Sequence, residues 1–291
     1  MECNQHMQDL SVSQWRELES SFWNQNHLGM QVNWKLNEQY NKLLRKRYFR
    51  IIESYLTKDG ANILDLGCGD QWYFDHLNLS RSDVKVTGVD SDKVAISECT
   101  KKFLKTNPNF TYVCTDSITF LDQSIEIFDV IFCFASLHHM HEDDCAVFFN
   151  KVRAHLKQGG KLVIFEPLYF QDRPFIDRMI INLHRGMRFL QMATSGFARD
   201  KKKALLSPLE RPLPFSSIRN WSKEHFVINS VEPVHYMALS FAIREFVSGR
   251  SKPSAFIWFL HLVDTLVMKS GIKFLSTRYW HTMFFVELSA N

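Results

Sequence analysis

An α/β fold with a doubly wound, mostly parallel sheet is the fold class that the sequence predicts. Between residues 60 and 167, short apolar segments rich in β-branched and aromatic residues alternate with segments of amphipathic helical spacing. Strands that alternate with helices indicate right-handed β-α-β units, which build parallel sheets. The composition agrees, because 291 residues of which 45% are hydrophobic can fill one large core.

The expected elements follow one another in a regular order. Residues 1 to about 58 have helical spacing. Five strands are expected in NILDLG, VKVTGVD, FTYVCTD, FDVIFCFAS and GKLVIFEP, the last after a turn at Gly159 and Gly160. Helices are expected between them in DQWYFDHLNL, DKVAISECTKKFLK and EDDCAVFFNKVRAHLK. Beyond Pro167 we expect helices, a proline-rich connection, a strand in HFVINSVEPVHYMAL and a closing strand in RYWHTMFFVELSA.

The first strand is followed by a glycine turn. Gly67 and Gly69 supply two glycines of the G-x-G-x-x-G fingerprint that holds a dinucleotide pyrophosphate. Trp72 stands at the third glycine, where its ring would obstruct close helix–sheet packing, so a nicotinamide oxidoreductase is disfavoured. Asp90 ends the second strand, where a carboxylate can accept hydrogen bonds from both hydroxyls of a ribose. The pattern indicates a nucleoside site without a phosphate cradle.

Four residues at the ends of expected strands share one edge of the expected sheet. Gly67, Asp90, Asp116 and Phe134 each stand at the end of an expected strand. A doubly wound sheet binds ligands beyond the carboxyl ends of its strands, at the switch in strand order. One ligand could therefore contact all four residues.

Five features occur in the order LDLGCG, VTGVD, CTDS, FDVIFCFASLHHM and LKQGGKLVIFEP. In this combination the chain resembles the class I S-adenosylmethionine-dependent methyltransferases over about residues 60 to 167. The resemblance implies a Rossmann-like sheet of seven strands with the last strand antiparallel, and S-adenosyl-L-methionine as the cofactor. The chain departs from the family at Gln71, where a further glycine is usual.

The resemblance also implies roles for individual residues. The first motif, where the backbone passes the methionine part of the cofactor, comprises Asp65, Gly67, Cys68 and Gly69. The ribose acid is Asp90, followed by Ser91. The adenine amino group would be read at Asp116 and Ser117, and the end of the fourth strand, Phe134 and Ala135, would lie beside cofactor and substrate. Structural alternatives stay open, since the glycines can form a simple turn and either Asp90 or Asp116 can cap a helix.

The segment SLHHMHEDD and the end of the fifth strand hold the candidate catalytic residues. His138 and His139 follow the fourth strand, and a neutral histidine suits proton transfer near pH 7. Glu166, in FEP, is a candidate base or substrate acceptor. Adjacent histidines in a loop do not face one point, so no metal site is expected. His141 and the acids after it are typical of a helix start.

Composition limits the partners. The net charge of +4 is too weak to indicate nucleic acid, and the sequence after the fourth strand, ASLHH, differs from the N/D-P-P-Y/F type of base-methylating relatives. The six cysteines lack a C-x-x-C pair and indicate reduced thiols of a cytoplasmic protein. The apolar helix at AFIWFLHLVDTLVM is too short for a bilayer span. Basic residues from Arg173 to Lys203 either form a solvated face or contact an anionic membrane peripherally.

These observations lead to one expected function and an expected division of the chain. We expect methyl transfer to a small or lipid-like acceptor at oxygen. A non-catalytic cofactor-binding partner subunit and a nucleic-acid methyltransferase are the alternatives. Residues 1–58 would fold over the cofactor, residues 59–167 would form the cofactor-binding core, and residues 168–291 would form a helical substrate lid plus the last two strands. The apolar character of the lid favours an amphipathic acceptor.

Overall fold

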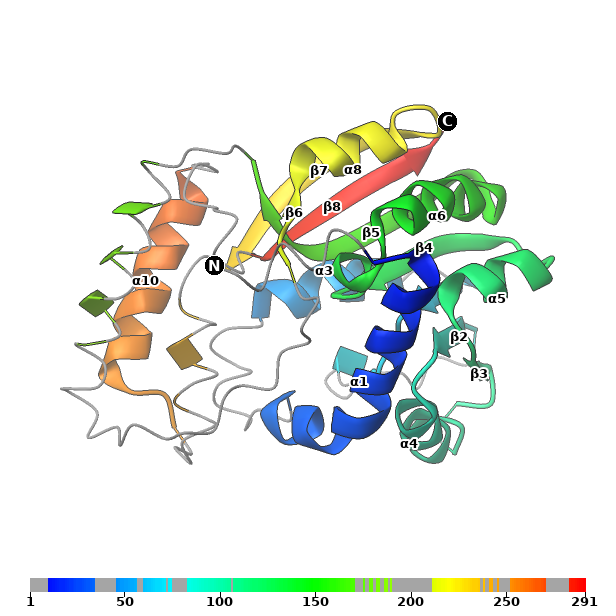
Figure 1. Ribbon diagram of the computed structural model, residues 1–291, viewed down its shortest axis with the longest axis horizontal. Coiled ribbons are helices and arrows are strands. Elements are labelled where there is room, and N and C mark those ends of the chain that lie inside the picture. Colours follow the sequence, from blue (N-terminus) through cyan, green and yellow to red (C-terminus); the bar gives the residue numbers. More distant parts are fainter. Residues whose placement is uncertain are drawn as a thin grey trace.

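The structure is a computed structural model. It describes residues 10–34, 46–56, 60–71, 73–74, 83–105, 107–170, 211–235, 252–270 and 283–291, and isolated residues within 175–189 and 238–245. An α/β domain forms around one twisted sheet, with helices on both of its faces (Figure 1).

Within the described residues, the sheet has eight strands. Seven form a continuous path in the order β3-β2-β1-β4-β5-β8-β7, and the short β6 pairs with β5 off this path. β8 is antiparallel to both of its neighbours, and the other pairings are parallel. The expected doubly wound sheet with a reversed last strand is therefore confirmed. The strands are β1 (Asn62–Leu66), β2 (Lys85–Asp90), β3 (Phe110–Cys114), β4 (Phe128–Phe134), β5 (Leu156–Tyr169), β6 (Leu213–Pro214), β7 (Phe226–His235) and β8 (Met283–Ala290).

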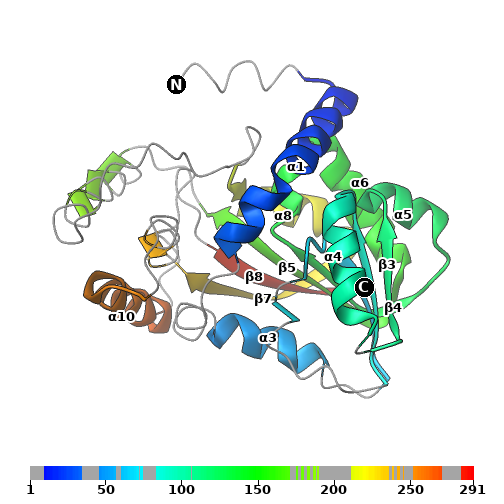
Figure 2. The same cartoon turned by 90° about the horizontal axis from the view of Figure 1, so that it is seen from below.

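Helices cover the sheet on two sides (Figure 2). One buried cluster joins the strands to α3, α4 and α10, and a second joins them to α5, α6 and α8. The helices are α1 (Val12–Trp34), α3 (Lys46–Leu56), α4 (Lys93–Phe103), α5 (Ser117–Gln123), the 3₁₀ turn η3 (Leu137–His139), α6 (Glu142–Ala154), α8 (Phe215–Ser222) and α10 (Ala255–Lys269).

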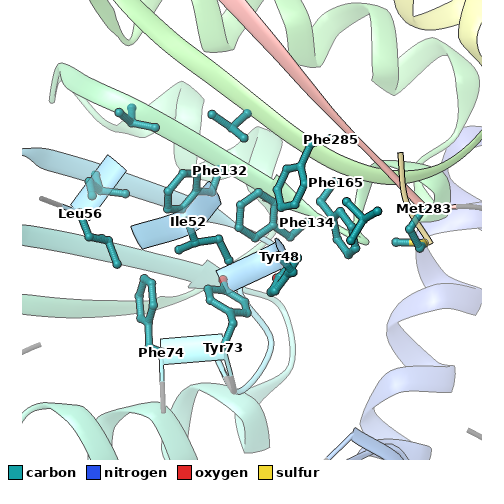
Figure 3. Packing of buried hydrophobic residues seen from close by; sticks show 14 of the residues in the cluster. Tyr48, Ile52, Leu56, Tyr73, Phe74, Phe132, Phe134, Phe165, Met283 and Phe285 are labelled. Atoms are coloured by element: carbon teal, nitrogen blue, oxygen red, sulfur yellow. The ribbon is translucent and has the colours of Figure 1, made fainter. Parts of the chain in front are cut away.

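The first cluster is an aromatic core built on α3. Tyr48, Ile52 and Leu56 recur every fourth residue, so they form one buried stripe of the helix. The ring of Tyr48 lies 4.7 Å from that of Phe165 and 5.4 Å from that of Phe285, centroid to centroid. Figure 3 shows this stripe packed on side chains of the central strands. The α3 stripe thus closes one face of the sheet.

Some elements differ from the expectation. β5 begins at Leu156, so the expected turn at Gly159 and Gly160 lies inside a strand. Gly159 has a φ of 70°, and the register with β4 shifts there, because a left-handed glycine forms a bulge without ending the pairing. β6 and α8 form within and just after the proline-rich connection, and α5 follows β3. Trp72, most of the expected DQWYFDHLNL helix, and most of residues 172–206 and 238–249 lie outside the described residues.

Candidate active site

The loop after β1 has three residues in the left-handed region. Gly67, Gly69 and Gln71 have φ values of 69°, 54° and 47°. The N–H groups of Gly67 and Cys68 both donate to the carbonyl of Val89, at 2.8 and 3.1 Å, which ties the loop to β2. A Cβ on Gly67 would overlap the side chain of Ser136. Position 67 therefore needs glycine both for its φ and for this close approach.

Asp90 ties the glycine loop to the start of α4. Its Oδ2 accepts a hydrogen bond from the N–H of Gly69 and its Oδ1 accepts one from the N–H of Asp92, each at 2.8 Å. The N-cap of α4 is Asp92, which accepts from Val94. The alternative that Asp90 is the cap of this helix is therefore wrong. Ser91 is exposed beside them.

Asp65 is a fully buried carboxylate under the loop. Its Oδ2 accepts hydrogen bonds from the amide of Gln71, at 2.5 Å, and from the hydroxyl of Tyr73. Burial and, to a smaller extent, the nearby Asp90 raise its pKa to about 7, although the two hydrogen-bond donors oppose the shift. Its Oδ1 has no hydrogen-bonding partner among the described residues. A buried carboxylate oxygen that lacks a hydrogen-bonding partner is a strong acceptor for a donor group of a ligand.

Gln71 is a site residue that the sequence pattern does not reveal. Its buried amide donates to Asp65, and its Oε1 accepts a hydrogen bond from Tyr112 at 2.7 Å. The ring of Tyr112 reaches this point across Gly88, where a Cβ would lie 2.8 Å from the ring. Gln71 keeps the left-handed conformation of the usual glycine, and the side chain adds a bridge between β1 and β3. In the sequence, this role is indicated by a polar residue at a position where the family that the chain resembles usually has glycine.

Replacing Gln71 by alanine is expected to lower the free energy of unfolding by about 1–3 kcal/mol, because Asp65 and Tyr112 each lose a buried partner. Alanine meets the same left-handed backbone, so the lost bridge dominates the change. Urea unfolding measures the effect, with the exposed Gln123→Ala as the control. Equal stabilities of Gln71→Ala and wild type would show that the bridge contributes nothing.

The turn after β4 is held by Glu166 from the neighbouring strand. Ala135 has a φ of 51°, which is unfavourable for a residue with a Cβ. Its N–H donates to the carbonyl of Phe165 at 2.7 Å. The next two N–H groups, of Ser136 and Leu137, donate to Oε1 of Glu166 at 2.8 and 2.7 Å. These three hydrogen bonds fix the strained turn.

The same carboxylate contacts one of the two candidate histidines. Nδ1 of His138 lies 2.5 Å from Oε2 of Glu166, and both side chains are buried. Burial raises the pKa of Glu166 to about 7, against the hydrogen bonds from Leu137 and Ser136. His139 faces α1 instead, with Nδ1 3.5 Å from Oε2 of Glu19. The structure therefore pairs His138 with Glu166, while the ring of His139 packs against that of His138, 4.0 Å away centroid to centroid.

Glu166 is expected to make stability depend on pH. Its folded-state pKa of about 7 lies above that of an unfolded glutamate, so this group favours folding at low pH. That contribution is full below the unfolded pKa and is lost as the pH rises through about 7. Unfolding free energies measured from about pH 4 to pH 8 should therefore fall less steeply with pH in Glu166→Gln than in wild type. Parallel curves for the two proteins would contradict a raised pKa.

The N-terminal helix α1 lies across this turn. Nε1 of Trp15 donates to the carbonyl of His139 at 2.6 Å, and Arg16 makes two hydrogen bonds with Asp144 of α6, at 2.8 and 2.6 Å. Sequence patterns could not show these contacts, because they join residues more than 120 positions apart.

The remaining candidates lie at the expected ends of strands. Asp116 is the N-cap of α5 and accepts from the N–H of Thr119 at 3.0 Å, so its capping role is real, and Ser117 begins the helix. Phe134 belongs to the aromatic core beside Tyr48. His141 is the N-cap of α6, as expected. Within the described part of the chain, no three His, Cys, Asp or Glu side chains are grouped to hold a metal.

The strand order with its one reversed strand, and the glycine loop between two acids at strand ends, define a class I S-adenosylmethionine-dependent methyltransferase fold. Comparison with known proteins agrees, since residues 63–160 match the family model described as a methyltransferase domain. The chain thus has the fold of that class, and it is similar to a methyltransferase domain over residues 63–160.

Individual relatives match over different shares of the chain. A ubiquinone biosynthesis O-methyltransferase of Coxiella burnetii is 30% identical over 113 residues, which are 39% of this chain and 46% of that protein. The chain thus matches less than half the length of this relative. The cyclopropane synthase MmaA2 of Mycobacterium tuberculosis is similar in fold, with a TM-score of 0.59, 18% identity and coverage of 89% and 88% of the two chains. The magnesium protoporphyrin IX methyltransferase of Synechocystis PCC 6803, solved with bound S-adenosylmethionine, has a TM-score of 0.51, 11% identity and coverage of 95% and 97%.

Proposed function

We propose that the protein transfers a methyl group from S-adenosyl-L-methionine to an oxygen atom of a small, amphipathic acceptor. The observation that carries this proposal is the buried Oδ1 of Asp65, which has no partner among the described residues and lies under the glycine loop. The ammonium group of the cofactor's methionine part would supply the donor that this oxygen lacks.

The other residues of the loop fit the same cofactor. Asp90 would hold the ribose, since each carboxylate oxygen can accept more than one hydrogen bond. Asp116 and Ser117 would hold the adenine end, and the backbone from Gly67 to Gly69 would pass the methionine part. A sulfonium cofactor needs no phosphate cradle, which agrees with the absence of a third glycine. When bound, the cofactor supplies an electrophilic methyl group.

Transfer to oxygen is supported by the pair of His138 and Glu166. With its carboxylate ionised, Glu166 would accept a hydrogen bond from Nδ1–H of His138, and this would fix the tautomer in which Nε2 is the basic nitrogen. Nε2 would take the proton of an acceptor hydroxyl while the new C–O bond forms and the C–S bond breaks. Backbone hydrogen bonds from Ser136 and Leu137 hold Glu166 in place for this role. The enzyme must also align the acceptor oxygen with the methyl group, and the rigid turn after β4 would support this alignment.

An amphipathic acceptor is supported by two observations. The relative from Coxiella burnetii is named for ubiquinone biosynthesis. The aromatic core reaches the carboxyl ends of β4 and β5, where Phe134 and Phe165 pack around Tyr48. We propose that residues 1–58 close over the cofactor, that residues 59–167 hold it, and that residues 168–291 supply a helical lid over the acceptor in addition to the last two strands of the sheet.

The test is transfer of radiolabel from methyl-labelled S-adenosylmethionine. We expect label in long-chain phenols, less in the same phenols without the chain, and none in total tRNA. Label in tRNA would contradict the proposed acceptor class. Cofactor binding without transfer to any of the acceptors would favour the non-catalytic partner subunit instead.

A further inference from the structure

Helix α10 carries a large apolar face that is open to solvent. Trp258, Leu262 and Leu266 recur every fourth residue, with Phe259 beside them, and these four side chains are 56–60% exposed. Side chains at this spacing lie on one face of a helix. We name these four residues the α10 stripe. Monomeric proteins rarely leave such a continuous apolar patch uncovered.

Helix α10 is apolar on its inner as well as its outer side, since Ile257 and Leu260 are buried in the core. Its one acidic residue, Asp264, is fully buried and accepts a hydrogen bond from the N–H of Ala238 at 2.9 Å. His261 is half-buried, and burial lowers its pKa, so it is neutral at pH 7. The one acid of the helix thus lies on the inner side among apolar residues, and the outer side carries exposed apolar residues instead of the polar ones of an ordinary surface helix. A helix whose outer side is apolar in this way is adapted to a non-aqueous environment on that side.

A lysine stands at each end of α10. Lys252 precedes the helix and Lys269 ends it, and both are exposed. Lysines at the two ends of an apolar helix can extend their side chains to lipid headgroups while the apolar side chains enter the acyl region. No carboxylate of α10 is exposed to oppose an anionic surface.

A second set of exposed apolar residues lies at the same end of the molecule. The set comprises Phe175, Met179, Leu183 and Phe189, which are 58–75% exposed. Figures 1 and 2 both place this stretch at the end of the molecule that carries α10. Residues 171–203 contain eight Lys or Arg and three Asp, so the surrounding sequence is strongly basic. Apolar side chains interleaved with basic ones are typical of a helix that lies in a membrane interface.

We propose that the α10 stripe docks the protein onto the surface of an anionic lipid bilayer. The helix has 15 residues and is about 22 Å long, so it would lie in the interface. No helix in the described ranges is long and apolar enough to span a membrane. The excess positive charge of residues 171–203 favours an anionic lipid surface over a second copy of the chain, which would carry the same charge.

The test is co-sedimentation with vesicles. Wild type should bind vesicles of phosphatidylglycerol and phosphatidylcholine, and should bind pure phosphatidylcholine more weakly. Trp258→Glu combined with Leu262→Glu should lower the partition coefficient by about tenfold or more. The matched control is Ile125→Glu combined with Val227→Glu, which makes the same change at two exposed apolar residues away from α10 and should bind like wild type.

A second measurement is independent of these substitutions to glutamate. Lipids brominated in their acyl chains should quench the fluorescence of wild type more than that of Trp258→Phe. Absence of binding to anionic vesicles, or equal binding of the stripe variant and its control, would overturn the proposal. A wild-type dimer that the stripe variant converts to monomer would also overturn it, since the stripe would then be a subunit interface. Binding is read without methyl transfer, so failure here leaves the proposed reaction untouched.

Discussion

Replacing Asp90 by alanine is expected to weaken binding of S-adenosylhomocysteine by about 100-fold or more. The variant loses two charge-assisted acceptors for the ribose, each contributing about 1.5–3 kcal/mol. It also releases the N–H groups of Gly69 and Asp92, which the carboxylate now holds at 2.8 Å. Isothermal titration calorimetry of the two proteins measures the ratio of dissociation constants.

The matched control for Asp90 is its neighbour Asp92. Asp92 caps α4 through hydrogen bonds from Val94 and Ala95, so Asp92→Ala should lower stability by about 1 kcal/mol while it retains most of the affinity. Equal losses of affinity in the two variants would show that Asp90 acts only through the fold of the loop. Unchanged affinity in Asp90→Ala would contradict its proposed role at the ribose.

Replacing His138 by alanine is expected to lower kcat for methyl transfer to a hydroxyl by about 10²–10⁴-fold, which is the usual contribution of a positioned general base. The affinity for S-adenosylhomocysteine should stay the same, because His138 contacts the carboxylate of Glu166 rather than the glycine loop. Initial rates with the long-chain phenol that accepts the label give the comparison.

His139 provides the control in the same turn. Its ring faces Glu19 and Trp23 of α1, so His139→Ala should change kcat far less than His138→Ala does. The rate of Glu166→Gln should also fall, and its pH profile should shift, because the amide cannot hold the Nδ1 proton as a carboxylate does. A His138→Ala enzyme that transfers methyl groups at the wild-type rate would exclude the histidine as the base.

Sequence patterns predicted the parts of the structure that depend on local order. Short apolar segments ending in glycine or aspartate gave the ends of β1 and β2, and alternation with amphipathic helices gave the parallel sheet. The placing of Asp65 and Asp90 at neighbouring strand ends follows from that topology alone. These features need no knowledge of which distant side chains meet.

The features that patterns did not predict depend on contacts between distant residues. The bridge from Gln71 to Tyr112 spans 41 positions, and the pairing of His138 with Glu166 spans 28. The bulge at Gly159 depends on pairing with β4. Gly159 and Gly160 therefore lie inside β5, although the two glycines locally indicate a turn. The outward stripe of α10 was equally hidden, since hydrophobic spacing alone does not say which face is buried.

The claim that the protein binds S-adenosylmethionine is tested most directly by binding of S-adenosylhomocysteine to the wild-type protein. Binding is measured by thermal unfolding with S-adenosylhomocysteine, with NAD and without ligand. A ligand at 100 times its dissociation constant stabilises the folded state by about 2.7 kcal/mol. For a chain of this size, Tm should then rise by about 5 °C or more. We predict this rise with S-adenosylhomocysteine and none with NAD. An unchanged Tm with S-adenosylhomocysteine, or an equal rise with NAD, would contradict a site built for a sulfonium nucleoside.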